Sequence, residues 1–304
     1  MIGVGYLGTF HAEKYAGLDG VRLVGVVDVN PARAREVARR FHAAAWADYR
    51  ELLGQVDCVS LAVPTPLHFG LAAALLEQGI DVLVEKPIAE TAAQGKRLVA
   101  LAAEHGRILQ VGHLERFNPA IRSLDGILTR PRFIECHRLT SFVERGTDVD
   151  VILDLMIHDL DVILSFVDGP IERVEAVGVP VLSETVDIAN ARLRFAGGVI
   201  ANITASRVAL KRERKIRFFQ ADAYVSVDYG EKSVRICRRL PAADGGLASI
   251  DVSEHSFADA DPLYDEIAAF VSAVRTRARP LVDGMTALRA LEVAERIRSS
   301  LESA

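Results

Sequence analysis

The chain has 304 residues, of which 50% are hydrophobic and 25% are charged, a length and composition that predict about two globular domains with ample core. Its formal net charge of -5 argues against nucleic acid or an acidic membrane as the main partner, and no apolar run reaches membrane-spanning length. Cys58, Cys136 and Cys237 lie far apart and form no disulfide or metal spacing, which fits a reducing, cytoplasmic location.

The first motif in chain order is the glycine-rich run GVGYLG. Gly3, Gly5 and Gly8 have the dinucleotide-binding spacing, in which glycines allow a tight turn, the approach of a pyrophosphate and close helix packing. Asp28 ends the strand that follows, about 20 residues beyond the glycines, as that fingerprint requires. An acid there accepts hydrogen bonds from a ribose 2′-hydroxyl and repels a 2′-phosphate, so NAD is favoured over NADP. Arg33 and Arg35 are close enough to weaken that preference, although we expect both to be solvated on their helix.

The strand before this motif is short. Only Met1 and Ile2 precede Gly3, whereas the first strand of such a fold usually has about five or six residues. The sequence therefore predicts either a start assigned too late or a first strand that is a stub.

Strands and helices then alternate along the first part of the chain. The pattern predicts strands at 21–27, 58–63, 81–84 and 107–111, and helices at 9–18, 32–40, 66–78 and 92–105. Such alternation is typical of a doubly wound parallel sheet, so we expect an NAD-binding Rossmann domain over residues 1–117.

Beyond Phe117 the pattern changes. A helix at 118–128 and a long helix at 152–167 precede closely spaced strand-like runs from RVEAVGVPV to SVRICRRL, and helices at 261–274 and 285–301 close the chain. Residues 118–304 are therefore expected to form a substrate-binding and oligomerisation domain of the α+β class, with a largely antiparallel open sheet.

Lys86 lies in the run DVLVEKPIAE, where an apolar strand ends and Pro87 fixes the turn. Ligands of open α/β sheets lie just beyond the carboxyl ends of such strands, so a long cation there can reach a bound substrate. The alternative is a surface lysine that begins a loop.

In VPTPLH, Thr65 can cap a helix that starts with proline, and His68 either faces the cofactor or only occupies that first turn.

The long helix supplies a second chemical signal. Asp154 and His158 are four residues apart in DVILDLMIHDLDVIL, a spacing that places them on one helix face. An imidazole beside a carboxylate is a candidate general base near neutral pH. The alternative is an aspartate and a histidine that are only solvated. A metal site that also uses Asp159 and Asp161 is disfavoured because these residues span more than one face, so no metal is expected.

GVGYLGTFHAEKY, VPTPLH, VEKP and the spaced Asp154 and His158 together resemble the glucose-fructose oxidoreductase/inositol dehydrogenase/rhizopine catabolism (Gfo/Idh/MocA) family of NAD(P)-dependent dehydrogenases. The resemblance covers nearly the whole chain and implies a catalytic set of Lys86, Asp154 and His158. It also implies a set of cofactor-binding residues: Gly3, Gly5, Tyr6, Leu7, Gly8, Asp28, Pro64, Thr65, His68, Glu85 and Lys86.

Two further segments, VGHLERFNPA and SRVALKRERKIRFFQ, resemble the branch of UDP-N-acetylglucosamine 3-dehydrogenases within that family. Arg116 and Asn118 follow the last Rossmann strand and are candidates for substrate binding, together with Lys86, Asp154 and His158. Arg116 could equally form an ion pair at a domain interface. The charged run of Lys211, Arg212, Arg214 and Lys215 either meets a diphosphate or is a solvated loop.

The expected function is NAD-dependent oxidation of a sugar hydroxyl to a ketone, at the 3-hydroxyl of a UDP-sugar such as UDP-N-acetylglucosamine. The expected partners are a sugar nucleotide and further copies of the chain, as a homodimer or homotetramer through the C-terminal sheet. One alternative is a dehydrogenase or reductase of another sugar, polyol or carbonyl compound in the same family. The other is a non-catalytic NAD-sensing regulator, against which the intact Lys86, Asp154 and His158 argue.

Overall fold

The computed structural model describes residues 1–142, 149–240 and 249–302. The chain forms two compact units, one made of Met1–Leu114 with Asp261–Leu291 and the other of Glu115–Ala260 with Glu292–Ala304. Residues 261–291 thus pack with the N-terminal unit, whereas our expected domains placed them in the second, at 118–304.

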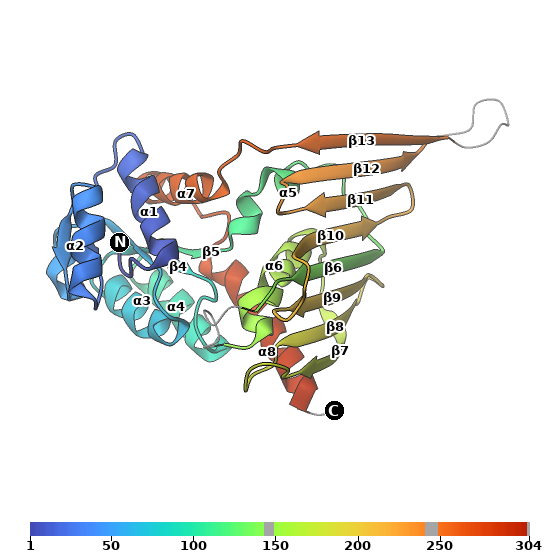
Figure 1. Ribbon diagram of the computed structural model, residues 1–304, viewed down its shortest axis with the longest axis horizontal. Helices are drawn as coiled ribbons and strands as arrows, with labels where there is room; N and C mark the ends of the chain where they lie inside the picture. The colour runs from blue at the N-terminus through green and yellow to red at the C-terminus, as the bar shows by residue number, and fades with distance from the viewer. Residues whose placement is uncertain (143–148, 241–248, 303–304) are drawn as a thin grey trace. The chain divides into compact units, whose positions relative to one another are not determined.

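A parallel sheet forms the centre of the first unit (Figure 1). Ile2 lies in the middle of the sheet, bridging Val27 on one side and Leu61 on the other. On the Val27 side of Ile2 lie β1 (Gly25–Val27) and β2 (Ala44–Trp46). On the Leu61 side lie β3 (Cys58–Leu61), β4 (Asp81–Glu85) and β5 (Leu109–Gly112). All pairs of these strands are parallel. The doubly wound Rossmann sheet predicted from the sequence is therefore confirmed.

The short first strand is nevertheless hydrogen-bonded on both sides. The Ile2 amide donates to Ser60 O at 2.9 Å, and the Gly3 amide donates to Val27 O at 2.8 Å. The Met1 amino group is buried and donates to Gly25 O at 3.0 Å. Burial lowers the pKa of this amino group to about 5.

Local capping determines where the helices of the first unit begin. Asn30 accepts hydrogen bonds from the amides of Ala32 and Arg33, and Pro31 occupies the first helical position after it. Thr91 accepts a hydrogen bond from the Gln94 amide in the same way. The helices are α1 (Tyr6–Gly17), α2 (Pro31–Arg40), α3 (His68–Glu77), α4 (Ala92–Glu104) and α7 (Pro262–Thr276).

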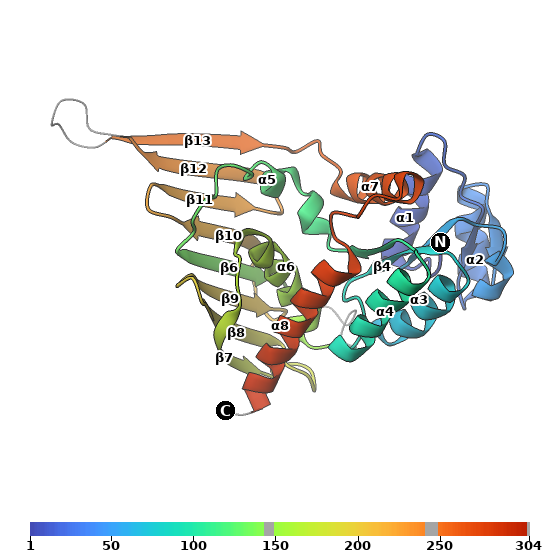
Figure 2. The same ribbon diagram turned by 180° about the vertical axis from the view of Figure 1, so that it is seen from behind.

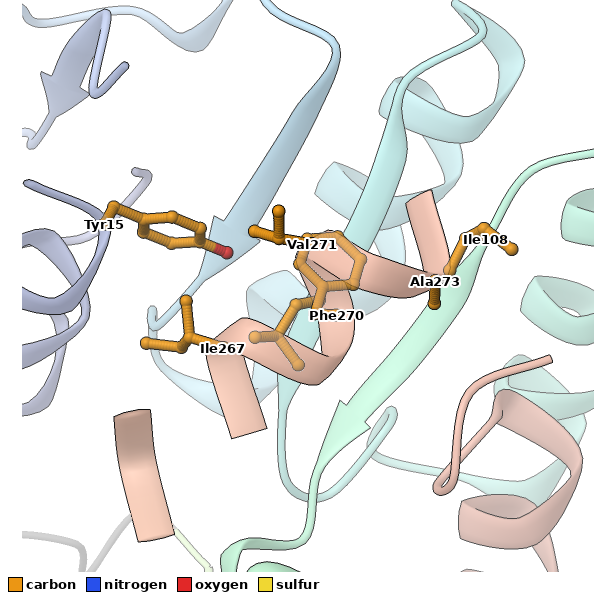
Figure 3. Close-up of a cluster of buried hydrophobic side chains, with 7 residues drawn as sticks. Tyr15, Ile108, Ile267, Phe270, Val271 and Ala273 are labelled. Carbon is orange, nitrogen blue, oxygen red and sulfur yellow. The ribbon is translucent and has the colours of Figure 1, made fainter. Parts of the chain in front are cut away.

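Helix α7 belongs to the first unit because its apolar face is buried there (Figure 3). Ile267 and Phe270 are fully buried and pack with Tyr15 of α1 and with Ile108. Each such side chain stabilises the unit by about 1.5–3 kcal/mol relative to an exposed one. Arg277, just after α7, also forms an ion pair with the buried Asp81 of β4. The sequence predicted this amphipathic helix but not the unit against which it packs.

The second unit is built on an eight-stranded sheet with the order β13-β12-β11-β10-β6-β9-β8-β7. Every neighbouring pair is antiparallel except β6 and β9, which are parallel. The expected largely antiparallel sheet is thus confirmed. Its strands are β6 (Phe133–Leu139), β7 (Ile171–Val179), β8 (Ile188–Phe195), β9 (Ile200–Ser206), β10 (Glu213–Phe219), β11 (Ala223–Asp228), β12 (Ser233–Arg239) and β13 (Ile250–Ser256).

Helices cover one face of this sheet (Figures 1 and 2). Helix α6 (Ile157–Phe166) follows a π-helical turn at Ile152–Met156, and its Phe166 ring lies 5.4 Å from the ring of Phe218 on β10. The C-terminal part of α8 (Gly284–Glu302) is held by Arg298, which forms an ion pair with Asp150 at 2.7 Å. The described residues contain no helix that is both long and apolar enough to cross a membrane.

Strands β2 and β13 were not predicted from the sequence, and two further elements also differ from the prediction. The helix expected at 118–128 is only α5 (Pro119–Arg122), and the chain turns through Gly126 in a left-handed conformation at φ 73°. Strand β6 was not predicted, although it lies in the middle of the sheet. Its buried positions alternate with half-buried ones, and Glu135, His137 and Arg138 interrupt any continuous apolar run.

Candidate functional site

The glycine loop of the first unit has the shape that a dinucleotide needs. Gly3 has φ 79°, and a Cβ there would collide with the carbonyl group of Ala62. A Cβ on Gly8 would collide with the Gly3 carbonyl, so α1 packs directly on the loop. At Gly5 a Cβ would meet nothing within 4 Å, which leaves the backbone open at the residue that precedes α1. An open backbone at a helix N-terminus is suited to bind the pyrophosphate of NAD.

Asp28 lies next to this loop at the carboxyl end of β1. Its carboxylate accepts hydrogen bonds from the amides of Val4 and Asn30, each at 2.9 Å. Arg33 is not solvated as we expected: its Nε donates to Val4 O at 2.9 Å and its Nη2 donates to Thr9 Oγ1 at 2.8 Å. Asp28 and Arg33 therefore both fix the glycine loop, and both lie beside the position at which cofactor preference is decided.

Lys86 directly follows β4, as predicted, and the same strand end holds Glu85. His68 is buried near this point, with Nδ1 2.8 Å from Pro87 O and Nε2 2.9 Å from Val63 O. Burial lowers the pKa of His68. Its ring thus lies between two backbone segments that follow β3 and β4, and in the neutral form its single N–H donates to one of the two carbonyls. Thr65 does not cap a helix, because it begins a short 3-10 turn and α3 starts at His68 without a side-chain cap.

Asp154 and His158 lie in the second unit, at the start of its long helix. Asp154 is inside the π-helical turn and His158 is in the first turn of α6; both are half-buried. The amide of Ile157 donates to Ile152 O, the five-residue step of a π-helix. Such turns occur frequently at functional sites, and nothing in the sequence pattern predicted this one.

The second unit places Arg116 and Asn118 in a polar network. Arg116 lies 3.6 Å from the buried Asp161, so it forms an ion pair within this unit. Asn118 caps α5 by accepting a hydrogen bond from the Ala120 amide at 3.1 Å, and its amide group donates to Glu115 at 3.3 Å. Asn118 is 2% exposed, and its side chain thus has a structural role in the fold.

Arg138 is the central residue of the same network. It donates to both carboxylate oxygens of Asp159, at 2.9 and 3.0 Å, and to Glu115 at 3.1 Å. Arg138 lies on β6, so it was missed together with that strand.

The basic run before and within β10 divides into exposed and paired residues. Lys211, Arg212 and Arg214 are exposed, whereas Lys215 is half-buried and lies 3.3 Å from Asp228. The side chain of Arg214 reaches the surface, but desolvation along its length and the nearby charge of Arg138 lower its pKa. Arg214 and the exposed Lys211 and Arg212 are therefore the cations available to an anion here.

Sequence reasoning also missed a buried group in the first unit. His11 of α1, Glu85 of β4 and Glu266 of α7 each bring one nitrogen or oxygen atom within 4.8 Å of the others. The signal that could have identified it is a glutamate on the apolar face of DEIAAFV, since a fully buried glutamate is rare unless it is paired.

Two family models match the chain along most of its length. Residues 1–113 match the oxidoreductase family with an NAD-binding Rossmann fold, and residues 120–230 match the GFO/IDH/MocA C-terminal domain. The chain belongs to the GFO/IDH/MocA oxidoreductase family. It is therefore an NAD-binding oxidoreductase, which agrees with the open glycine loop and with the resemblance seen in the sequence.

Individual members of the family give a finer comparison. The UDP-N-acetylglucosamine 3-dehydrogenase of Acidithiobacillus ferrooxidans is 36% identical over 304 residues, which cover 100% of this chain and 96% of that enzyme. Its solved structure has a TM-score of 0.92, with 99% of this chain and 96% of that chain covered. An inositol 2-dehydrogenase of Acidothermus cellulolyticus is 34% identical over 188 residues, which cover 58% of this chain and 55% of that enzyme. A levoglucosan dehydrogenase in complex with NADH and levoglucosan is 18% identical, with 99% and 96% of the two chains covered and a TM-score of 0.89, and shares the fold.

Proposed function

We propose that this family member oxidises the 3-hydroxyl of a UDP-sugar, UDP-N-acetylglucosamine, to a ketone with NAD. The observation that supports this substrate is the similarity to a UDP-N-acetylglucosamine 3-dehydrogenase across the whole chain. The inositol 2-dehydrogenase matches only about half of this chain. The similarity over the full chain, which includes the second unit, therefore favours the sugar nucleotide.

NAD is held by the first unit in this proposal. The open backbone at Gly5 and the N-terminus of α1 would hold the pyrophosphate, and Asp28 would accept hydrogen bonds from the adenosine ribose. The remaining proposed contacts come from the ends of β3 and β4, where His68 acts by fixing the backbone carbonyls of Val63 and Pro87. When bound, the cofactor supplies the acceptor for a hydride from the sugar carbon.

The chain's own residues move the proton and stabilise charge. His158 accepts the proton of the sugar hydroxyl as a general base, and Asp154 orients its ring or holds a neighbouring hydroxyl. The Lys86 ammonium group stabilises the oxygen as it becomes a carbonyl, because it is positioned at a buried strand end before the reaction starts. Together these three residues make up the proposed catalytic set.

The diphosphate of the sugar nucleotide is bound by the exposed arginines beside β10 in this proposal. Arg212 and Arg214 offer planar guanidinium groups, which can hold phosphate oxygens with two parallel hydrogen bonds. Arg116 forms an ion pair with Asp161. We propose that it supports this surface through that ion pair and does not bind the diphosphate directly. An Arg214→Gln variant should therefore raise KM for the UDP-sugar at least fivefold with kcat nearly unchanged.

The substrate is tested by the rate of NADH formation in a panel of UDP-N-acetylglucosamine, UDP-glucose, N-acetylglucosamine and inositol. A coupled aminotransferase removes the keto product so that the oxidation runs forward. We expect the highest kcat/KM with UDP-N-acetylglucosamine and a large loss with the free sugar. A higher kcat/KM with inositol would contradict the proposal. If NAD binds and no compound in a broad panel of sugars and polyols is oxidised, a non-catalytic NAD-sensing regulator replaces the proposed dehydrogenase.

We also propose that copies of the chain associate through the eight-stranded sheet in the cytoplasm. Val177 and Val179 of the edge strand β7 are exposed on this sheet, which supports an interface that includes β7. Light scattering coupled to size exclusion should give a dimer or tetramer. Val177→Lys should shift it towards the monomer.

A further inference from the structure

The group formed by His11, Glu85 and Glu266 lies entirely within the first unit. His11 and Glu266 are both fully buried, and Glu85 is 9% exposed. His11 Nε2 lies 3.0 Å from Glu85 Oε1. Neither carboxylate oxygen of Glu266 accepts a hydrogen bond from a donor group within the described residues. One imidazole and two carboxyl groups thus share a space from which water is largely excluded.

Two ionised carboxylates cannot be accommodated in such a space without a compensating charge. Burial penalises each carboxylate, and the two negative charges repel one another more strongly at low dielectric. His11 can balance one of them, and it already lies beside Glu85. Glu266 therefore needs a proton or a cation. Burial, with the charge of Glu85 as a second cause, raises the pKa of Glu266 well above its usual range.

The surroundings of Glu266 favour a proton over a metal ion. His11 Nε2 lies at hydrogen-bonding distance from Glu85 Oε1, 3.0 Å, so this nitrogen is directed at a carboxylate rather than at a metal ion, whose ligands must be deprotonated. From β5, Gln110 is neutral and donates to the Glu266 backbone carbonyl at 3.1 Å. The buried titratable side chains of α1 are His11 and Tyr15. The Tyr15 hydroxyl group is hydrogen-bonded to Ser60 at 2.7 Å.

The same group controls the strand end that holds Lys86. A Cβ at Gly112 of β5 would lie 2.7 Å from a Glu85 oxygen, so the glutamate side chain fills the space beside that glycine. Glu85 is therefore confined by Gly112 on one side and His11 on another. Its position determines the backbone from which Lys86 extends.

We propose that Glu266 is a positioning residue: its protonated carboxyl group donates a hydrogen bond to the Glu85 carboxylate and thereby fixes the end of β4 that presents Lys86. The protonation is a property of the folded chain, whereas the effect on turnover rests on the proposed function. The two parts are therefore tested by separate measurements on the full chain.

Protonation is tested without substrate by comparing the parent with Glu266→Gln, which keeps the shape and a donor but cannot ionise. The parent should show the infrared carbonyl band of a buried carboxylic acid at pH 7, and the variant should lack it. Above the pKa of an unfolded glutamate, the folded parent holds one proton more than the unfolded chain, so its stability falls as the pH rises. The unfolding equilibrium constant of the parent, relative to that of Glu266→Gln, should rise about tenfold per pH unit between about pH 5.5 and 7.

Three results would contradict a protonated Glu266. A missing infrared band, or a pH-independent ratio of the two unfolding constants, would overturn the protonated state. Stoichiometric zinc in the purified parent that is lost in Glu266→Gln would replace it with a metal site. Neither measurement uses a sugar, so a failure of the proposed function does not affect them.

Positioning is tested by turnover and NAD affinity. Glu266→Gln should keep kcat within about threefold of the parent and extend activity to higher pH, because its amide still donates to Glu85 and does not ionise. Glu266→Leu should lower kcat at least tenfold while NAD affinity stays within threefold. Equal kcat values for Glu266→Leu and the parent would overturn the positioning role, and so would an unchanged pH profile in Glu266→Gln.

Discussion

A single carboxylate, Asp28, connects the end of β1 to the glycine loop through the Val4 amide. Replacing Asp28 with alanine removes both the acceptor for a ribose hydroxyl and the negative charge that repels a 2′-phosphate. We predict that Asp28→Ala lowers the ratio of kcat/KM for NAD to that for NADP at least tenfold. Steady-state kinetics with both cofactors measure this ratio, and Glu77→Ala at an exposed position of α3 is the matched control. An unchanged ratio in Asp28→Ala would show that another residue selects the cofactor.

The proposed catalytic residues should affect the chemical step more than cofactor binding. Lys86→Ala and His158→Ala should each lower kcat by about 10²- to 10⁴-fold, the range typical of lost proton transfer or charge stabilisation. NAD affinity, measured by fluorescence, should change little because the glycine loop and Asp28 are intact. Lys96→Ala and His255→Ala, at exposed positions, are the matched controls. Turnover equal to that of the parent in either active-site variant would refute that residue's role.

Asp154→Asn keeps the shape of the side chain and removes its charge. We predict a lower kcat at neutral pH, because an imidazolium that forms at His158 loses the support of a carboxylate. The pH profile of kcat distinguishes this effect from a loss of folding. A variant with the same profile and rate as the parent would show that Asp154 has no part in proton transfer.

At the scale of elements, the connection between β7 and β8 is organised by one buried ion pair. Asp187 accepts hydrogen bonds from the amides of Val181, Leu182 and Ser183 and from Arg207 Nε at 2.8 Å. Burial acts to raise the pKa of Asp187, but these hydrogen bonds outweigh it and lower the pKa. Asp187 and Arg207 side chains are 0% and 5% exposed. The connection between the two strands therefore depends on a charge that has no contact with water.

We predict that Asp187→Asn lowers the free energy of unfolding by about 3 kcal/mol, because it leaves the Arg207 guanidinium buried without its counter-charge. The depressed pKa means that the parent gains this stability above the pKa of an unfolded aspartate. It loses the gain as the pH falls towards the folded value. Urea unfolding between pH 3 and 7 should show the difference between parent and variant shrinking on acidification. A difference that is constant with pH would contradict the ionised state of Asp187.

The elements show which parts of the sequence pattern determine structure locally. Helix α2 was predicted to within one residue at its N-terminus because Asn30 and Pro31 define that start through their own hydrogen bonds and fixed φ. Strand β6 was missed because its only signal is period-two burial, and a charged residue, Arg138, occupies one of its buried positions. Burying that arginine depends on Asp159, a partner far along the chain, which local patterns do not reveal.

The candidate site likewise contains residues whose roles depend on local sequence and residues whose roles depend on distant partners. Gly3, Gly5 and Gly8 were identified because their roles depend on backbone geometry within a single turn. The buried Glu266 was missed because its significance appears only when α7 packs beside α1 and β4. The π-helical turn at Asp154 has no sequence signature, so the sequence predicted the residue and not the backbone that holds it.

At the scale of the whole molecule, the residues proposed for cofactor binding and catalysis are distributed over both units. The first unit has the NAD-binding loop and Lys86, and the second has Asp154, His158 and the basic surface around Arg214. The sequence predicted both fold classes because each unit repeats one pattern many times. It did not predict that residues 261–291 return to the first unit, since an amphipathic helix indicates that a face is buried and not which partner buries it.

The central claim is that the chain transfers a hydride from C3 of UDP-N-acetylglucosamine to NAD. The most direct measurement uses UDP-N-acetylglucosamine with deuterium at C3 and analyses the reduced cofactor by mass spectrometry. We predict that the reduced cofactor contains the deuterium and that its formation is slower than with the unlabelled substrate in single-turnover kinetics. Reduced cofactor without deuterium would place the oxidation at another carbon, and the absence of any reduction by this substrate would contradict the proposed activity.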